Sequence, residues 1–418
     1  MMSIKKRLFV SSGFRQNIAL LIISAALIAY EIDLMHYLSI VQWHHFASGV
    51  ISIALLGFGA AGTCISLWRK QMLKHADLLI PLFMICSGIL MSVCFLLSSS
   101  SALVFDSYIL FVEQRQILKF IFTCFLYFIP FFCGALAIGL LFVKEVSQIG
   151  KYYFANLLGS GFGAVLIIFF LWSFMPKEIP AVISIFPVFA GLLIFDRRIF
   201  PVLISAAAIG IFAATFLFLQ KSEMNYSQYK SISYALNLPD SKVIQSENSP
   251  YGYIQIVSSP VQRYAPGLSL NYTDEIPPCD IIYSNGTWLS AVQRTGAGKD
   301  AEFYGSTTFA LPYSILRPKR ILIFGPGGGL EILYALRMKA DDITIVEPNK
   351  KVLDIMKKYY AEEIDSLLGQ DCMRFINDDY RAFLSRTQEK YDLIILPALG
   401  EFGGSVGLNA LNENTLFT

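Results

Sequence analysis

A glycine-rich stretch, Gly325-Pro-Gly-Gly-Gly329, joins an apolar run of strand type to a run of helix type. Glycine permits positive φ angles and a close approach of the backbone to a ligand, and the start of a helix presents unpaired N–H groups. Glu347 stands twenty-two residues after Gly325, where a carboxylate commonly accepts hydrogen bonds from both hydroxyl groups of a ribose. Asp378 and Asp379 end a third run, where an acid can accept a hydrogen bond from an adenine amino group. Together these residues predict a binding site for a nucleoside-type cofactor.

The elements that must position these residues alternate between strand and helix beyond Arg317. We expect strands at 321–324, 343–346, 373–376 and 391–396, and helices at 330–338, 350–360 and 380–386. Such alternation is typical of a parallel, doubly wound sheet, in which the carboxyl ends of the strands meet at one edge. Before it, short β-type runs between Lys242 and Leu289 are separated by turn signals and predict a small antiparallel β region.

Two alternatives to this site stay open at the level of sequence. A dinucleotide would require the spacing GxGxxG, but Leu330 and Glu331 follow Gly329, so S-adenosylmethionine or its decarboxylated form fits the loop better. The other alternative is a degenerate fold that keeps the glycines only for tight turns. The cysteine residues do not have the spacing of a metal site, and we expect no metal.

The composition indicates a membrane protein with a separate polar region. Of the 418 residues, 55% are hydrophobic and 15% are charged, which is too apolar for a soluble chain of this length. Residues 1–219 contain 14 Lys and Arg against 8 Asp and Glu, whereas the remainder contains 19 against 23. The polar region therefore shows no basic stripe for the phosphates of a nucleic acid, and we expect no nucleic-acid partner.

Seven apolar runs before residue 220 are long enough for a bilayer, which takes roughly 20 helical residues to cross. They lie at Asn17–Ile40, Phe46–Trp68, Leu78–Leu97, Ile117–Val143, Phe154–Phe174, Ile179–Phe195 and Phe200–Leu219. We therefore expect a polytopic transmembrane domain at 1–219, a β-rich lead-in at 220–300 and a Rossmann-like nucleoside-binding domain at 301–418. The last of these lacks the final strands of such a fold, and we expect it to be truncated.

The basic residues between the apolar runs alternate by side and predict an orientation. Eleven Lys and Arg lie on the side of the N-terminus against three on the other, which places the N-terminus in the cytoplasm, as in a bacterial inner membrane protein. Seven crossings would leave the polar region outside, away from a cofactor that is made in the cytosol. If Phe154–Phe174, with its Asn, Ser and Gly residues, is a re-entrant segment, six crossings return that region to the cytoplasm. We expect this second arrangement.

Two polar features lie inside the apolar runs. Glu31, Asp33 and His36 in the first run form either a site for a polar substrate or a proton, or an interfacial group beside Trp43. Residues 156–163 place small side chains at close spacing, which favours close helix packing over ligand binding.

Several motifs along the chain are characteristic of one family. They are Trp43-His-His-Phe46, Leu55-Leu-Gly-Phe-Gly59, Tyr152-Tyr-Phe-Ala-Asn-Leu-Leu-Gly159, Arg263-Tyr-Ala-Pro-Gly-Leu-Ser-Leu270, Gly325-Pro-Gly-Gly-Gly329, Val346-Glu-Pro-Asn349, Asp379-Tyr-Arg-Ala-Phe-Leu384 and Leu411-Asn-Glu-Asn414. On these motifs nearly the whole chain resembles the spermidine synthase-like proteins, and especially their multi-span bacterial membrane branch. The resemblance implies a Rossmann-like fold behind a small β domain, and a group transferred from decarboxylated S-adenosylmethionine.

The chain departs from this family at positions that would react. Soluble aminopropyltransferases carry an Asp in the glycine-rich loop, where this chain has Gly328, and a catalytic Asp in an Asp-x-x-Asp-Pro motif after the fourth strand. Here that stretch reads Leu396-Pro-Ala-Leu-Gly-Glu-Phe402. Because deprotonating an amine nucleophile requires a carboxylate, the catalytic candidates are Glu331, Glu401 and Glu413, and we expect little spermidine from putrescine.

Two functions follow from these observations. The first is a membrane-anchored transferase that moves an aminopropyl or methyl group from an S-adenosyl donor to an unknown small-molecule acceptor, either a polyamine or a lipid-soluble compound. The second is a non-catalytic sensor or transport module, in which ligand binding to a degenerate domain biases the helical bundle.

Overall fold

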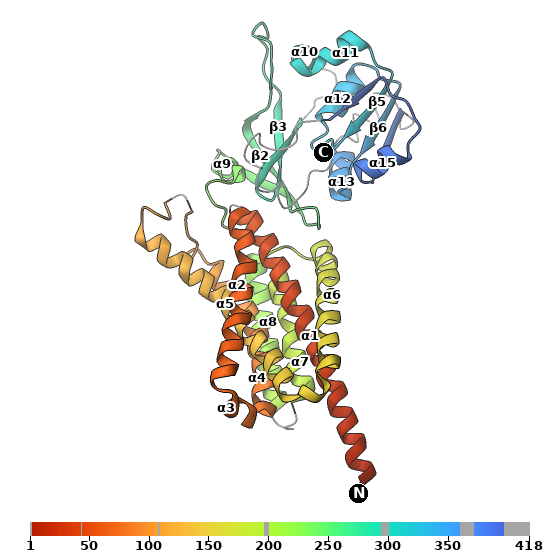
Figure 1. Cartoon of the computed structure of the whole chain (residues 1–418). Coiled ribbons are helices and arrows are strands. Elements are labelled where there is room, and N and C mark those ends of the chain that lie inside the picture. The colour runs from red at the N-terminus through yellow and green to blue at the C-terminus, as the bar shows by residue number, and fades with distance from the viewer. Residues whose placement is uncertain are drawn as a thin grey trace. The chain divides into compact units, whose positions relative to one another are not determined.

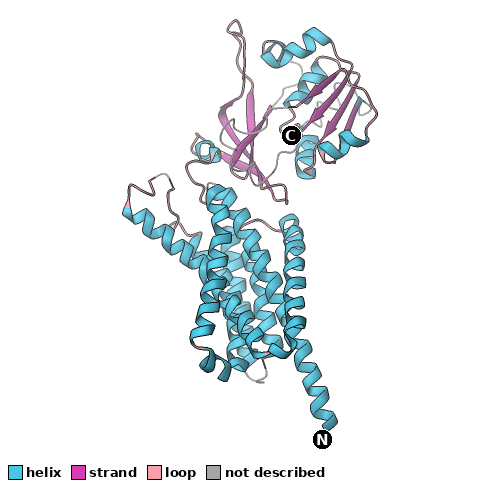
Figure 2. Ribbon diagram, in the orientation of Figure 1, coloured by secondary structure: helices cyan, strands magenta, loops and turns pink. Residues whose placement is uncertain are grey.

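The structure of the chain is a computed structural model that describes residues 2–42, 44–107, 109–195, 200–293, 301–359 and 372–396. It divides into two compact units, a helical unit at Met1–Tyr229 and an α/β unit at Lys230–Thr418. The described strands all belong to the α/β unit, whereas the described elements of the helical unit are helices (Figure 2).

The helical unit is a bundle of long apolar helices (Figure 1). They are α1 (Met2–Val41), α2 (His44–Leu67), the short α3 (Arg69–Lys74), α4 (Ala76–Ser98), α5 (Gln114–Lys144), α6 (Ile149–Ser173), α7 (Ile179–Ile194) and α8 (Phe200–Lys221). Among the described residues, five segments are long and apolar enough to cross a membrane, and they belong to α1, α2, α4, α5 and α6. The two further crossings at α7 and α8 stay a prediction, since their described apolar segments are shorter.

Helix α6 packs closely against α1. A Cβ atom added at Gly159 or Gly163 would lie 2.2 Å from the carbonyl oxygen of Leu21 or Ala25, so only glycine permits this approach. The hydroxyl group of Ser24 also donates a hydrogen bond to Oδ1 of Asn156 at 2.8 Å. The predicted packing role of the small residues is confirmed. The predicted re-entrant segment is wrong, because α6 is one continuous helix whose polar side chain is paired inside the bundle.

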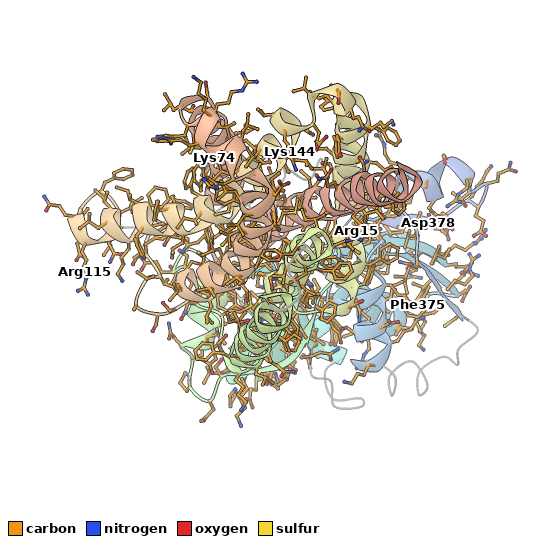
Figure 3. The ribbon with its side chains drawn as sticks, turned by 90° about the horizontal axis from the view of Figure 1, so that it is seen from below. Arg15, Lys74, Arg115, Lys144, Phe375 and Asp378 are labelled. Atoms are coloured by element: carbon orange, nitrogen blue, oxygen red, sulfur yellow. The ribbon has the colours of Figure 1, made fainter. Side chains whose placement is uncertain are left out.

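Contacts between helix ends show which ends lie together. Lys144 at the end of α5 forms an ion pair with Asp77 at the start of α4, and the Tyr152 hydroxyl donates to Oε1 of Gln16 at 2.7 Å. Figure 3 looks onto the bundle from below and labels Lys74 and Lys144 on these ends. The basic residues of several connections therefore gather at the end where α1 enters the bundle.

The opposite end of the bundle contains the start of α7 and the end of α8, because Nζ of Lys177 donates to the carbonyl oxygen of Gln220 at 3.0 Å. Because α6 is one continuous helix, it counts as one crossing, and the bundle has five crossings without α7 and α8 or seven with them. Both numbers are odd. Either number places the N-terminus and Lys221 on opposite sides of a membrane.

The α/β unit begins with a short helix, α9 (Ser231–Leu236), and an antiparallel sheet. Its strands β1 (Lys242–Glu247), β2 (Ile254–Arg263), β3 (Pro278–Ser284) and β4 (Thr287–Gln293) pair in the order of the chain. A two-residue turn with positive φ angles at Asn285 and Gly286 joins β3 to β4, as an Asn-Gly hairpin requires.

A parallel sheet with the strand order β7-β6-β5-β8 follows. Its elements are α10 (Ala301–Gly305), α11 (Leu311–Leu316), β5 (Arg320–Phe324), α12 (Leu330–Arg337), β6 (Asp342–Val346), α13 (Lys350–Tyr359), β7 (Met373–Ile376), α15 (Tyr380–Arg386) and β8 (Leu393–Ile395). Phe324 pairs with Val346, and Val346 pairs with Ile376, so the loops after three strands begin side by side. The order reverses at β5, where parallel sheets of this kind bind their ligands.

The two sheets of the α/β unit share one hydrophobic core. Ile256 and Val292 of the antiparallel sheet pack in the same cluster as Ile321, Ile323 and Leu333 of the parallel region. Because this cluster is continuous, β4 has a fixed position against the parallel sheet within the α/β unit.

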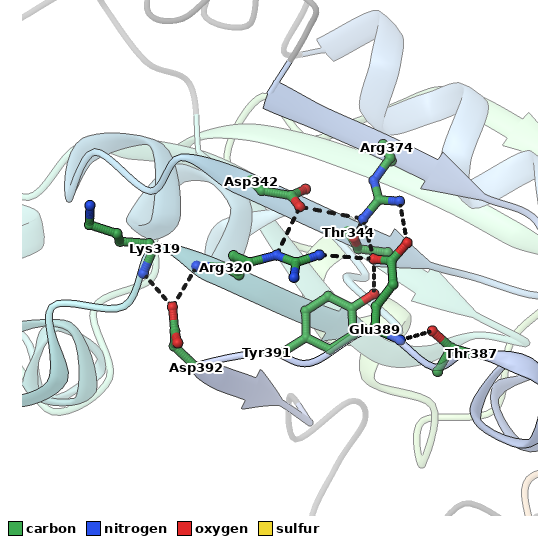
Figure 4. A network of polar contacts seen from close by, with 9 residues as sticks. All are labelled: Lys319, Arg320, Asp342, Thr344, Arg374, Thr387, Glu389, Tyr391 and Asp392. Carbon is green, nitrogen blue, oxygen red and sulfur yellow. Dashed lines mark hydrogen bonds and ion pairs between the residues drawn. The ribbon is translucent and has the colours of Figure 1, made fainter.

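A network of charged side chains lies at the amino ends of the parallel strands (Figure 4). The guanidinium group of Arg374 donates to both carboxylate oxygens of Glu389, at 2.8 and 2.6 Å, and contacts Asp342 at 3.4 Å. Arg320 of β5 contacts Asp342 and Glu389 at 3.3 Å each. This network lies at the edge opposite the glycine-rich loop, and we therefore assign it to stability rather than to ligand binding.

Candidate functional site

The glycine-rich loop forms a tight turn between β5 and α12. Gly325, Gly327 and Gly329 have φ angles of 57°, 52° and 78°, a region in which a side chain is strained. The N–H group of Gly325 donates to the carbonyl oxygen of Val346 at 3.0 Å, and that of Gly329 donates to Pro326 at 2.7 Å. The loop therefore needs glycine at three positions for its own conformation.

Gly328 is glycine for a different reason. A Cβ atom at this position would lie 1.9 Å from the carbonyl oxygen of Ala291 and 2.5 Å from its carbonyl carbon. The backbone of β4 thus occupies the space that a side chain would need. In this arrangement the Asp expected in the loop of soluble aminopropyltransferases is sterically excluded.

Glu347 follows β6 directly and lies beside the loop. The residue is 7% exposed. Its Oε1 accepts a hydrogen bond from the N–H group of Asn349 at 2.8 Å, and its Oε2 accepts one from the Tyr380 hydroxyl at 3.4 Å. Burial raises the pKa of Glu347 to about 7, and the hydrogen bonds from Asn349 and Tyr380 lower it in part. Each carboxylate oxygen has more than one lone pair, so these contacts orient the group and leave acceptors for a ribose diol.

Asp378 and Asp379 lie at the same edge, but both have local partners. Asp378 forms an ion pair with Arg386 and accepts the N–H group of Asp379 at 3.0 Å. Asp379 caps the start of α15 by accepting the N–H group of Ala382 at 3.0 Å. These contacts give both acids a structural role, and their contact with adenine stays a prediction.

Glu331 lies in the first turn of α12 and is 9% exposed. Burial raises the pKa of Glu331 to about 7. Tyr264 and Tyr313 lie within electrostatic range of its carboxyl group. A carboxyl group that titrates near neutral pH is suited to accept a proton from an amine. The other two candidates for this role, Glu401 and Glu413, lie outside the described residues.

The sequence reasoning missed Gln293 at the end of β4. Gln293 lies two residues after Ala291, on the same face of the strand, and is 2% exposed. Its Nε2 donates to the carbonyl oxygen of Tyr264 at 3.0 Å, whereas its Oε1 has no hydrogen-bond partner among the described residues. A buried acceptor without a donor costs about 1–3 kcal/mol, which a ligand N–H group would recover. A single Gln belongs to no recognisable sequence motif. Gln293 becomes a candidate only because the structure shows that β4 approaches the glycine-rich loop.

Part of this chain is similar to known proteins. Residues 303–407 match the family model of the spermine/spermidine synthase domain. This segment is similar to the spermidine synthase-like family. Polyamine aminopropyltransferases from Korarchaeum cryptofilum, Buchnera aphidicola and Streptococcus uberis are 30%, 32% and 34% identical to this chain over 95, 110 and 92 residues, which is 23%, 24% and 22% of the chain. These matches cover 30%, 38% and 32% of the relatives, so the chain spans about a third of their length.

The match to the family model includes the glycine-rich loop, Glu331 and Glu347 and does not extend to the helical unit. The predicted kinship with a membrane branch of the family stays a prediction. Within the described residues, no group of three or more His, Cys, Asp and Glu side chains could hold a metal ion.

Proposed function

We propose that this chain is a membrane-anchored transferase that moves an aminopropyl group from decarboxylated S-adenosylmethionine to an amine acceptor. The observation that carries the proposal is the buried carboxyl group of Glu347 beside the glycine-rich loop, inside the segment that matches the spermine/spermidine synthase domain. The names of the relatives favour aminopropyl over methyl transfer, and a transferase over a non-catalytic sensor or transport module.

The residues of the site have distinct proposed roles. Glu347 accepts hydrogen bonds from the ribose hydroxyls of the donor, and the loop at Gly325 and Gly327 lets the backbone approach it. The acceptor nitrogen attacks the carbon next to the sulfonium sulfur, the carbon–sulfur bond breaks, and a neutral thioether nucleoside leaves. Glu331 takes the proton that the acceptor nitrogen loses. Oε1 of Gln293, two residues after the Ala291 backbone that excludes a side chain at Gly328, accepts a hydrogen bond from an N–H group of an amine.

The kind of acceptor follows from the positions at which this chain differs from soluble aminopropyltransferases. A side chain at Gly328 is excluded, and in this proposal Glu331 takes the role of the catalytic Asp that soluble aminopropyltransferases carry after the fourth strand. We therefore propose an amine acceptor other than putrescine, either a longer polyamine or a lipid-soluble amine. The expectation of little spermidine from putrescine therefore stands as part of the proposal.

Decarboxylated S-adenosylmethionine is made in the cytosol, so the α/β unit must lie on the cytoplasmic side of the membrane to bind it. The proposal requires this unit in the cytoplasm of a bacterium, with the N-terminus on the far side of the inner membrane. The count of eleven basic residues against three between the apolar runs predicts the reverse orientation. A reporter fused after Lys221 that is active only in the cytoplasm supports the proposal, and one active only outside contradicts it.

The reaction itself is tested by release of the thioether nucleoside, which forms with every acceptor. Full-length protein in detergent is incubated with decarboxylated S-adenosylmethionine and a panel of amines, and products are identified by mass spectrometry. We expect release with at least one amine, a strong loss in Glu331→Gln, and normal release in the control Glu302→Gln, whose side chain is exposed. Folded protein that binds the donor and releases no thioether with any amine contradicts the proposed transfer.

A further inference from the structure

Asp33 lies buried inside the helical unit. Its side chain is 0% exposed, and neither carboxyl oxygen has a hydrogen-bond partner among the described residues. Asp33 is therefore enclosed between helices, whereas Glu31 two residues earlier is partly exposed. An ionised carboxylate in such a place costs several kcal/mol, so Asp33 needs either a proton or a bound cation.

The surroundings of Asp33 are aromatic. Tyr30, Asp33 and Tyr37 share one face of α1 by their spacing of three and four residues. That face packs against α4 and α5, because Tyr30 lies 5.5 Å from Phe131 and Tyr37 lies 4.7 Å from Phe95 between ring centroids.

Three tyrosine hydroxyls lie near the carboxyl group of Asp33. Tyr30, Tyr37 and Tyr127 lie within electrostatic range of the carboxyl group, and Cys94 of α4 lies within range of Tyr30. The Tyr30 hydroxyl donates to the carbonyl oxygen of Met91 at 3.2 Å, and the Tyr127 hydroxyl accepts from Ser98 at 3.0 Å.

Further unpartnered polar atoms lie toward the end of the bundle. Thr123, one turn before Tyr127 on the same face of α5, is 5% exposed and its hydroxyl has no partner among the described residues. The same holds for Oε1 of Gln42 just after α1, whose Nε2 donates to the carbonyl oxygen of Phe105. Gln42 is nine residues beyond Asp33, which corresponds to about 14 Å of helix.

We propose that Asp33 binds a primary ammonium group inside the helical bundle and carries a proton when no ammonium is bound. A carboxylate surrounded by aromatic rings is the environment that favours organic ammonium ions, since the ring faces attract the cation and the acid accepts its N–H groups. A hard metal ion would instead require several oxygen ligands, and within the described residues no group of three or more His, Cys, Asp and Glu side chains could hold one. The site lies outside the transferase domain and does not depend on the function proposed for it.

The test uses full-length protein in nanodiscs and n-butylamine hydrochloride as the probe. Calorimetry in buffers of different ionisation enthalpy measures both the affinity and the protons released. We expect saturable binding with proton release in the wild type, and more than about tenfold weaker binding without proton release in Asp33→Asn, the scale of a lost charge-assisted hydrogen bond. Glu31→Gln is the matched control and should bind like the wild type.

Infrared spectroscopy measures the protonation of Asp33 directly and does not depend on the heat of binding. The wild type without amine should show the carbonyl band of a protonated carboxylic acid that is absent in Asp33→Asn and disappears on addition of n-butylamine. Because the amide has the shape of the neutral acid, we expect Asp33→Asn to fold with an unchanged melting temperature. Equal binding by wild type and Asp33→Asn, or a response to sodium chloride and none to n-butylamine, overturns the proposal.

Discussion

The contact between Gly328 and β4 predicts a specific defect for the substitution Gly328→Ala. The added Cβ atom would lie 1.9 Å from the carbonyl oxygen of Ala291, well inside any normal contact, so either β4 or the loop must move by more than 1 Å. Overpacking of this kind costs about 1–3 kcal/mol. The φ angle of Gly328 is outside the positive region, so the cost comes from the steric contact and not from the backbone conformation.

Hydrogen exchange followed by mass spectrometry of full-length protein in detergent measures this cost locally. A loss of about 1–3 kcal/mol speeds exchange of the β4 and β5 peptides about 5- to 150-fold, since each 1.4 kcal/mol is a factor of ten. Gly305→Ala is the matched control, because its Cβ atom meets nothing within 4 Å. Gly328→Asp should be at least as destabilising as Gly328→Ala, and it should not restore putrescine chemistry. Wild-type exchange in a folded Gly328→Ala protein would refute the approach of β4 to the loop.

Three further predictions follow from the structure. Burial raises the pKa of Glu347 to about 7, so donor affinity measured by calorimetry should fall by about tenfold per pH unit below pH 7, and Glu347→Gln should remove this dependence. Gly163→Ala should lower the melting temperature in detergent because of its contact with Ala25, whereas Gly161→Ala, with nothing within 4 Å, should not. Arg374 holds the pKa of Glu389 at about 2, below its ordinary 4.5, so Glu389 stabilises the fold above pH 4.5 and this stabilisation is lost as the pH falls toward 2. Glu389→Gln should therefore cost at most about 1 kcal/mol at pH 6 and nothing near pH 2 in thermal melts, since both partners are partly exposed.

The parallel sheet could be predicted almost to the residue. The expected strand at 373–376 is β7, and the expected strand at 321–324 differs from β5 by one residue. Buried parallel strands are continuous apolar runs between glycine and turn residues, so their positions are set by local sequence. Glu347 could be predicted for the same reason, because it follows such a strand at a fixed distance from the loop.

The contacts that sequence could not give are those between distant segments. The excluded side chain at Gly328 depends on β4, thirty-seven residues earlier in the chain, and the unpaired oxygen of Gln293 depends on the same approach. The polarity of Asn156 indicated a re-entrant segment, whereas its amide is paired with Ser24 across α1 and α6. Asp33 gave two interpretations because its burial is decided by α4 and α5.

Binding of decarboxylated S-adenosylmethionine to the full-length protein tests the central claim most directly. Isothermal titration calorimetry in detergent should show saturable heat for the wild type, a loss of about 1.5–3 kcal/mol in Glu347→Ala, and no loss in Glu302→Ala. Equal affinity of Glu347→Ala and the wild type would remove Glu347 from the site. No heat with the donor at millimolar concentration, from protein that is folded, would contradict a donor site at the glycine-rich loop.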